Sequence, residues 1–433
     1  MQKAIALLAV LLFVFPAFAQ PDTVAQRGAR SLSLKATHWS RGEYRVGALP
    51  DENGQDMAMF LTGKSILQFD FSHGGFEMRI APKYSGVWGS RSNGGLGINE
   101  AWAGVRHPSG LFLRVGRQKL EYDDERIIGD DDWTMATNTH DVLKTGFEAG
   151  RHKLHLLLAF NQNDENVNGG TRYVDGGQVY KSMQTLWYHV DPMPQLGASL
   201  IFMNTGMQNM LANVLNKTEY QQIFGAFLSW HPRPFEIQAS YYRQTGYDEY
   251  SLPIHAWMTS AEAVGHLGAG WDLNAGYFFM SGDDYYIVPR EGEIGLARKT
   301  QVLGFNPIFG SHHEFYGAMD FFYVTTYYGG NSPGLQDGHL GFAWRPAERF
   351  EMDATYHLLA TGVKVRDTGK VLGHELELNV SLKLSQDVKL QAGYSFMKGT
   401  ETMKRLKRTG ERNHLHWGWL MLIVTPEIFS LTK

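Results

Sequence analysis

Apolar and polar residues alternate along most of this 433-residue chain. The segment 375–384 is typical: Leu376, Leu378, Val380, Leu382 and Leu384 alternate with polar residues. A period of two indicates a β-strand with one apolar and one polar face. Such segments span roughly 10–14 residues, above the usual strand length of about 5–6 and suited to the about 9–11 residues of a tilted transmembrane strand. The pattern therefore favours an all-β transmembrane barrel over a soluble propeller or sandwich.

Tyrosine and tryptophan residues flank many of these segments, as expected for the aromatic girdles at the two interfaces of a membrane barrel. They are Trp39, Tyr44, Tyr84, Trp88, Trp187, Tyr188, Trp230, Tyr241, Trp344, Trp417 and Trp419.

The connectors between the segments alternate in length. Eight short ones lie at 72–75, 107–110, 148–151, 191–195, 231–234, 266–270, 345–348 and 385–387. Nine longer, polar ones lie near 46–55, 89–96, 121–138, 161–177, 206–218, 246–252, 282–335, 362–372 and 399–412. Seventeen connections predict a single antiparallel barrel of about 18 strands, with short periplasmic turns and long extracellular loops.

One segment is ambiguous, because 312–328 also resembles a strand. Counting it would give an odd number of strands, whereas bacterial single-chain barrels have even numbers. We therefore assign 282–335 to one long loop that folds partly into or over the pore. A barrel of this size is wide enough for an aqueous channel.

The first twenty residues, "MQKAIALLAVLLFVFPAFAQ", combine Lys3, an apolar run and Ala17-Phe18-Ala19. They predict a secretory signal peptide over 1–19, followed by a one-domain barrel over 20–433 in the outer membrane of a Gram-negative bacterium. The chain has no cysteine, which excludes disulfides and thiolate sites. Its formal net charge of −4 argues against a nucleic-acid partner. We read Thr425–Lys433 as a periplasmic tail.

Residues 95–133 carry a family likeness. They hold Asn99-Glu100-Ala101-Trp102, Gly116-Arg117-Gln118, Arg126-Ile127-Ile128-Gly129 and Trp133, and Asp141 follows. This arrangement resembles the core motif of the alginate export family of outer-membrane proteins, and 306–320 and 334–342 resemble later family elements. The resemblance implies an eighteen-stranded barrel with a charged lumen that lets a polyuronate leave the periplasm. Family members also serve other anionic or small solutes.

A polyuronate carries one carboxylate per sugar, so its path needs inward-facing cations. Arginine suits this role because its planar fork matches a carboxylate. Alternation places Arg79, Lys83 and Glu77 on the inner face of the third strand. On the fifth strand, Arg114 is inward because the residues on either side of it are apolar. The alternative is that these charges only form a solvated porin wall.

Arg117 is harder to place. Strict alternation after Val115 would turn it towards lipid, whereas a β-bulge at Gly116 would shift the phase by one residue. We expect the bulge, which turns Arg117 inwards. Arg126, Asp130 and Asp141 would then be its partners in a network at the mouth of the pore.

Other charged stretches carry weaker signals. The acidic run 121–132 lacks the spacing of a calcium loop, so we expect a solvated acidic loop and no metal or other cofactor. His312-His313-Glu314 lacks metal-ligand spacing. The basic stretch 404–412 would either contact lipopolysaccharide phosphates or an anionic polymer, or remain solvated.

No nucleophile motif such as G-x-S-x-G occurs, which argues against an enzyme. The sequence thus predicts a passive outer-membrane channel for anionic polysaccharide or related anionic solutes, with periplasmic export partners possible. A small-solute uptake porin is the first alternative, and a barrel hydrolase is the second.

Overall fold

The computed structural model describes residues 29–47, 57–162, 165, 167, 180–211, 217–283, 299–322, 332–407, 409 and 412–432. The predicted signal peptide, 1–19, lies outside the described residues. Among those that are described, no helix is long and apolar enough to cross a membrane.

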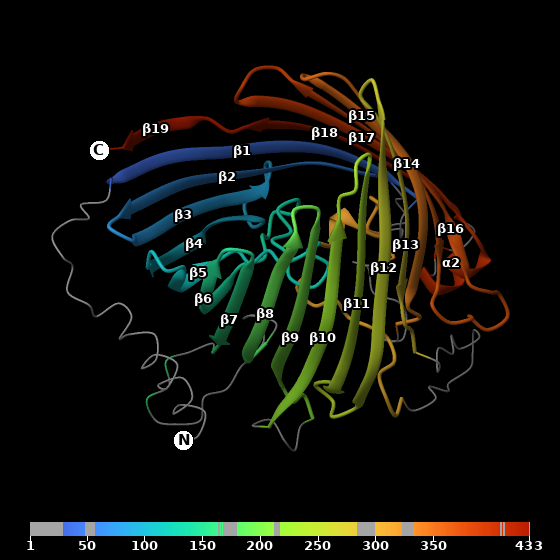
Figure 1. The fold of residues 1–433 in the computed structure, drawn as a ribbon. Helices are drawn as coiled ribbons and strands as arrows, with labels where there is room; N and C mark the ends of the chain where they lie inside the picture. The colour runs from blue at the N-terminus through green and yellow to red at the C-terminus, as the bar shows by residue number, and fades with distance from the viewer. Residues whose placement is uncertain are drawn as a thin grey trace.

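Eighteen antiparallel strands form a closed barrel, which Figure 1 shows from the side. They are β1 (Ser31–Val46), β2 (Met57–His73), β3 (Phe76–Val87), β4 (Gly94–Arg106), β5 (Leu111–Gln118), β6 (His140–Ala149), β7 (His152–Phe160), β8 (Ser182–Met193), β9 (Leu196–Gln208), β10 (Thr218–Trp230), β11 (Phe235–Tyr247), β12 (Pro253–Gly268), β13 (Trp271–Met280), β14 (Leu335–Ala347), β15 (Phe350–Ala360), β16 (Val371–Lys383), β17 (Val388–Gly399) and β18 (His414–Val424). Each strand pairs with its neighbours in sequence, and β1 also pairs with β18, which closes the wall.

The predicted alternation of connections is confirmed. Eight turns of two to four residues join the strands at one end, and nine longer loops join them at the other. The ambiguous segment 312–328 begins with the 3-10 helix η1 (His312–Glu314), and its described residues to Phe322 form no strand. The remainder of that segment lies outside the described residues.

Apolar and polar side chains lie on opposite faces of the barrel wall, as expected from their alternation in the sequence. On β16 the apolar phase faces outwards, and Leu376 and Leu378 are each 44% exposed. Glu375, on the opposite phase, is 1% exposed because it faces a filled interior. The outer face is thus apolar, as lipid requires, and the polar face is turned inwards.

The prediction of a periplasmic tail is wrong for residues 427–432. After a break at Thr425 and Pro426, the chain continues as β19 (Glu427–Thr432), which pairs with the first residues of β1 from Ser31 to Lys35. The reason is that β1 extends beyond its pairing with β18, which begins at His38. An unpaired strand edge is unfavourable, and β19 supplies its missing hydrogen-bond partners.

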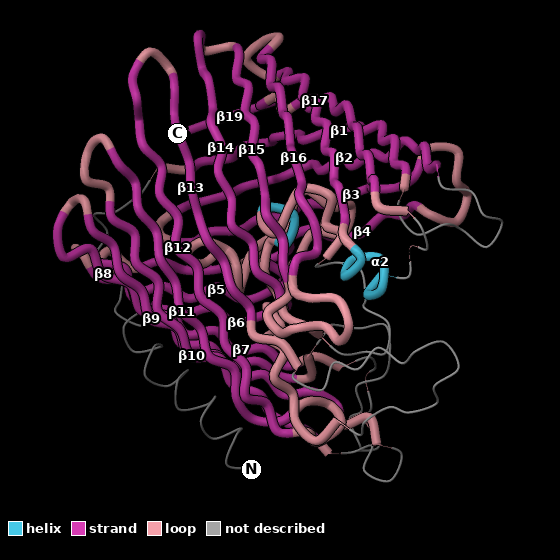
Figure 2. Tube along the Cα trace, turned by 90° about the vertical axis from the view of Figure 1, so that its right-hand side faces the viewer, coloured by secondary structure: helices cyan, strands magenta, loops and turns pink. Residues whose placement is uncertain are grey.

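Two long loops fold into the barrel instead of projecting from it. They follow β5 (119–139) and β13 (281–334, described at 281–283, 299–322 and 332–334). Figure 2 shows η1 and adjoining loop segments enclosed by the strands. We call residues 119–139 the first inner loop and residues 299–322 the second inner loop. The expectation that 282–335 folds partly into the pore is therefore confirmed for the second inner loop.

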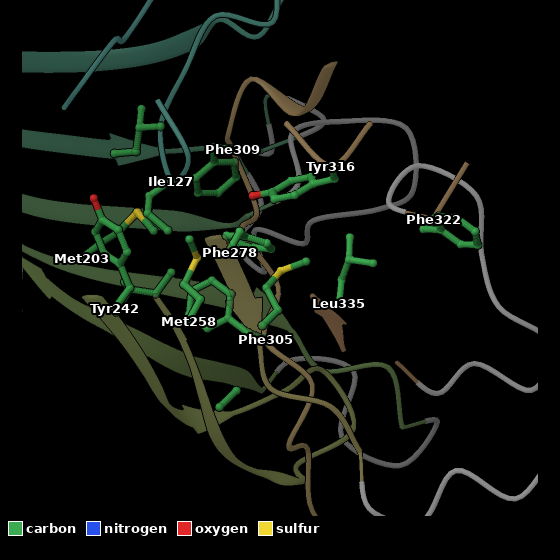
Figure 3. Close-up of a cluster of buried hydrophobic side chains, with 14 of the residues drawn as sticks. Ile127, Met203, Tyr242, Met258, Phe278, Phe305, Phe309, Tyr316, Phe322 and Leu335 are labelled. Atoms are coloured by element: carbon green, nitrogen blue, oxygen red, sulfur yellow. The ribbon is translucent and has the colours of Figure 1, made fainter. Parts of the chain in front are cut away.

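The core of the molecule is the contact between these loops and the inner wall. Figure 3 shows a part of this apolar cluster, with Ile127, Phe305, Phe309 and Tyr316 from the inner loops and Met203, Tyr242, Met258 and Phe278 from the wall. Its side chains exclude water from that side of the lumen. The remaining space in the barrel is therefore bounded by the loops as well as by the strands.

Candidate functional site: the charged lumen

The inner wall from β2 to β6 carries paired charges. Arg79 on β3 contacts Asp70 at 2.6 Å and Glu100 at 3.0 Å. Arg114 on β5 contacts Glu77 at 2.7 Å, and its guanidinium lies 4.5 Å from the ring centre of Trp102. Arg79, Glu77 and Arg114 thus lie together on the inner face, where alternation placed them.

Lys83 also faces inwards, since its ammonium donates to the carbonyl of Met135 in the first inner loop at 3.2 Å. Lys144 on β6 lies 5.0 Å from the ring centre of Tyr122 in the same loop. Among the described residues, no carboxylate lies within ion-pair distance of either lysine. The positive charges of these two inward lysines are therefore not balanced by a direct ion pair.

A β-bulge occurs in this wall, but not at Gly116. Ala81 lies opposite Glu100 and Pro82 lies opposite Ile98, so Asn99 is an extra residue in β4. Asn99 and Glu100 consequently both face the interior and are buried. The bulge sets the phase that turns Glu100 and Trp102 towards the lumen, while Ile98 remains on the outside.

The expected bulge at Gly116 is wrong. The pairing of β5 with β4 and with β6 continues through Gly116 without a register shift. Gly116 has a φ of 127°, and a Cβ there would lie 2.2 Å from the carbonyl oxygen of Ala101. Glycine is therefore needed for backbone conformation and close approach, not for a change of phase.

Arg117 keeps the outward phase of Val115, which is 52% exposed. Its guanidinium forms two hydrogen bonds with Asp141, at 2.9 and 2.7 Å. Arg117 and Asp141 are opposed across β5 and β6, near the end of the barrel that carries the long loops. The expected mouth network is therefore wrong, because Asp141 pairs with Arg117 on the outer face while Arg126 and Asp130 lie elsewhere.

The first inner loop uses its acidic residues to attach to the wall. Asp132 pairs with Lys64 of β2 at 2.9 Å, whereas Asp130 pairs with Lys119 of the same loop at 2.7 Å. Lys64 is 1% exposed and also donates to the backbone carbonyls of Asp132 and Thr134. The expectation of a solvated acidic loop is wrong, because Lys64 of the wall and Lys119 of the loop itself offer these carboxylates cations inside the barrel.

Arg126 is buried inside the barrel, against β12, and is 3% exposed. It contacts Asp124 at 3.1 Å and also pairs with Glu262 of β12. Its guanidinium lies 3.8 Å from the ring centre of Phe315 in the second inner loop. Arg126 thus fastens the first inner loop to the far wall and to the second loop.

The two inner loops are also joined directly. Ile128 and Phe309 form a parallel bridge, and the amide of Gly129 donates to the carbonyl of Phe309 at 2.8 Å. The hydroxyl of Ser311 donates to Glu125 at 2.8 Å. The loops therefore form one packed body inside the barrel.

Burial raises the pKa of several carboxyl groups in the first inner loop. It raises the pKa of Asp124 to about 6, although Arg126 opposes the shift. Burial and the charge of Asp320 raise the pKa of Asp131 to about 6. The pKa of Glu121 is raised by burial and then by Asp130 and Glu125. Near neutral pH, these three carboxyls are therefore closer to protonation than ordinary acidic side chains.

Two cavities remain beside the loops. One, of about 450 Å³, is lined by the cations Arg79, Arg114, Lys119 and Lys144 and the carboxyl groups Asp70, Glu77, Glu100 and Glu121. We call it the basic cavity. The other, of about 620 Å³, is lined by Arg126 and by Glu262, Glu314, Asp337, Glu351, Asp353 and Glu377. We call it the acidic cavity; it lies against β12–β18, on the far side of the ring of strands.

The sequence interpretation missed three contributors to these cavities: Lys144, Lys119 and the acidic wall. Lys144 was detectable, since alternation over 140–149 puts it on the phase of His140 and Val142. The acidic wall was also visible in the polar phases of β15 and β16, at Glu351, Asp353 and Glu377. Lys119 lies beyond the end of β5, where no periodicity predicts its direction.

The basic stretch 404–412 is partly helical, as α2 (Glu401–Lys407). Lys404 pairs with Glu401 at 2.7 Å, and Arg405 lies 3.4 Å from Asp367. Lys407 is 3% exposed and lies 5.1 Å from the ring centre of Phe321. Two of these cations thus have protein partners, and a third is buried against the second inner loop.

Comparison with solved structures gives similar barrels. The crystal structure of OccAB2 from Acinetobacter baumannii has a TM-score of 0.62 and 13% identity, covering 92% of this chain and 98% of that one. OccK5 (OpdH) from Pseudomonas aeruginosa has a TM-score of 0.60 and 13% identity, covering 92% and 99%. OpdO from the same organism has a TM-score of 0.57 and 14% identity, covering 92% and 98%. At sequence identities of 13–14%, the similarity to these structures establishes the fold and nothing more.

No curated protein matches the chain. The family comparison is decisive, because residues 89–414 match the family described as Alginate export. The matched residues contain strands β4 to β17 in full and both inner loops. They also contain the bulge at Asn99 and the constrained Gly116. With its closed barrel and charged lumen, this chain belongs to the alginate export family of outer-membrane channels.

Proposed function

We propose that this outer-membrane channel passes anionic saccharides of the alginate type, or related anionic solutes, through the basic cavity. The observation that carries the proposal is the set of four cations that line this cavity: Arg79, Arg114, Lys119 and Lys144. A uronate carboxylate can exchange between such groups as it moves, since conduction requires several weak sites in place of one strong site.

The charges that line the basic cavity are consistent with weak binding of a passing anion. Four cations face four carboxyl groups, so the formal balance is zero. Burial, and then the charges of Asp130 and Glu125, raise the pKa of Glu121, so this carboxyl group is closer to protonation than an ordinary glutamate. Because Arg79 and Arg114 already have carboxylate partners, a passing anion competes with those partners and is held weakly.

The acidic cavity supports the same route, because its negative charge is unfavourable for a passing polyanion. Its lining has six carboxyl groups, three histidines and the single arginine Arg126, which is already paired with Asp124 and Glu262. The one histidine held between two carboxylates, His357, leaves the carboxyl groups in excess. A polyanion there would meet like charge at short range, which is unfavourable. The two cavities thus divide the lumen into a path suited to anions and a wall that repels them.

A second candidate is a channel for small acidic solutes. The inner loops support it, because they leave cavities of about 450 and 620 Å³ in place of an open pore. Such spaces suit one or a few sugar units more readily than a wide polymer path. The dependence of current block on the length of the saccharide distinguishes the two candidate functions.

The test is conductance of the purified protein in planar bilayers. We expect anion selectivity, with current blocked by oligouronates and not by neutral oligosaccharides of equal length. Arg114→Gln with Lys144→Gln should reduce both anion preference and block. Arg117→Gln is the matched control, since it removes a cation from the outer face and should change neither.

Block that strengthens with chain length supports the polymer, and block by monomers alone supports the small-solute channel. Cation selectivity in the unaltered protein would overturn the anionic route. An equal effect of Arg117→Gln and the lumen double variant would overturn the assignment of the path to the basic cavity.

A further inference from the structure

Two histidines and an aspartate meet on the inner wall of the acidic cavity. Asp337 and His339 lie two residues apart on β14, so both face inwards, and His357 lies directly opposite His339 on β15. One possible ligand atom from each of the three residues lies within 4.8 Å of the other two. All three line the acidic cavity.

The contacts of His357 show how this cluster is held together. Its Nδ1 lies 3.0 Å from each carboxylate oxygen of Asp337, and its Nε2 lies 3.3 Å from Glu377 on β16. A carboxylate accepts hydrogen bonds, so His357 satisfies both sides only when both ring nitrogens carry protons. In this arrangement a ring cation lies between two carboxylates.

His339 lacks a comparable arrangement. Its Nδ1 is buried without a hydrogen-bond partner, and the nearest carboxylate oxygen, on Asp337, is 3.5 Å away. Its ring centre lies 5.4 Å from that of His357, with the planes 37° apart. A buried imidazole nitrogen without a partner, directed at a neighbouring carboxylate, has the chemistry of an unused metal ligand.

We propose that Asp337, His339 and His357 bind one divalent first-row transition-metal ion, of the Zn²⁺ class. Two imidazoles and one carboxylate suit such ions, whereas Ca²⁺ and Mg²⁺ prefer sites made of oxygen alone. The ion replaces the ring proton of His357 as the positive charge and gives the Nδ1 of His339 a partner. Adjacent hydrogen-bonded strands hold the three ligands in place.

The site leaves coordination positions open towards the acidic cavity. Three protein ligands leave at least one position of a tetrahedral ion for water or for a solute oxygen. The bound ion also offsets the negative charge of nearby Glu377, which faces His357. The ion therefore adds a positively charged contact to a wall that otherwise repels anions.

The test uses the full chain, folded in detergent and purified through a tag without histidine. Titration with Zn²⁺ should show one site per chain, and Co²⁺ should give the visible absorption of a four- or five-coordinate ion. His339→Ala should weaken Zn²⁺ binding by about 10-fold or more and abolish the Co²⁺ spectrum. It is the cleanest variant because it leaves the contact of His357 with Asp337 intact.

Three further variants complete the test. Asp337→Asn should also weaken binding. His374→Ala is the matched control, because His374 lies on the outward phase of β16 and bonds Tyr356 at 2.6 Å. His266→Ala removes an exposed histidine that contacts Glu236 and Asp272.

Binding retained in His374→Ala and His266→Ala but lost in His339→Ala supports the site. Absence of Zn²⁺ binding, equal binding in His339→Ala, or loss in His266→Ala instead would overturn it. The heat-dependent shift of folded barrels on gels shows that each variant is folded. The inference does not depend on the solute that the channel carries.

Discussion

The indole of Trp133 stacks on the imidazole of His313, with ring centres 4.1 Å apart and planes 10° from parallel. This contact joins the first inner loop to the second inside the barrel. Arg41 of β1 covers Trp133, with its guanidinium 4.0 Å from the ring centre, and Trp419 of β18 lies 5.0 Å away. Trp133 thus links both loops to the seam where the barrel closes.

Trp133→Ala should loosen both inner loops and raise single-channel conductance. Truncating a packed tryptophan costs about 3–5 kcal/mol, and the cost here falls on loop docking because Trp133 belongs to no strand. Bilayer recordings measure the change. The matched control is Trp230→Ala, which removes an exposed ring from the rim of the barrel and should leave conductance unaltered. Unchanged conductance in Trp133→Ala would contradict the role of the loops in narrowing the lumen.

Arg126→Met should strongly destabilise the folded protein. The change leaves Asp124 and Glu262 facing each other without their cation, and removing one partner of a buried ion pair costs about 3–5 kcal/mol. Urea unfolding in lipid vesicles measures the loss. Arg345→Gln is the control, since Arg345 also contacts two carboxylates, Asp272 and Glu351, but is half exposed. Its cost should stay below about 1 kcal/mol, and similar losses in both variants would refute the burial argument.

Deleting Asn99 should leave the barrel able to fold. Ile98 then directly precedes Glu100, and because these two residues already lie opposite the adjacent residues Pro82 and Ala81, the pairing becomes regular with Ile98 still outside and Glu100 still inside. The folded fraction on heat-shift gels should stay close to that of the unaltered protein. Deletion of Val115, where the pairing of β5 is regular, turns the residues before it over relative to those after it and should lower the folded fraction sharply. A similar loss of folding in both variants would contradict the assignment of Asn99 as the extra residue of β4.

The inner loops should be more stable at mildly acidic pH than above neutrality. Asp131 has a folded pKa of about 6, against about 3.9 when unfolded. Its contribution to stability is therefore fully present below about pH 4 and is lost as pH rises through 6. Asp131→Asn mimics the protonated group, so the difference in urea midpoint between pH 4.5 and pH 8 should shrink. Asp387→Asn, in a short turn, should leave that difference unchanged.

The wall was predictable because its pattern is local. Alternation and connector lengths give the strand number, the alternation of turns and loops, and the inward direction of Arg79, Lys83 and Arg114. Each of these depends on neighbours two residues away or on a nearby turn. The same local reasoning placed 312–328 outside the wall, since the parity of strands left no position for it.

The interior was not predictable, because its contacts join residues that are distant in sequence. The direction of the acidic run depends on Lys64, Arg126 and Glu262, which sequence spacing does not bring together. Likewise, the bulge was expected at Gly116 because glycine permits unusual backbone angles. The steric need at Gly116 arises from Ala101 on the next strand, while the extra residue is Asn99, whose side chain gives no such signal.

The separation of Glu125 and Ser311 has a consequence for the order of folding. These partners are 186 residues apart, whereas most wall contacts join adjacent hairpins. Long-range contacts form late because their loop-closure entropy must be overcome first. We expect the hairpins of the wall to pair first. The docking of the inner loops and the closure between β1 and β18, which joins residues even further apart, come later, so that a partly assembled barrel is wider and leakier than the finished channel.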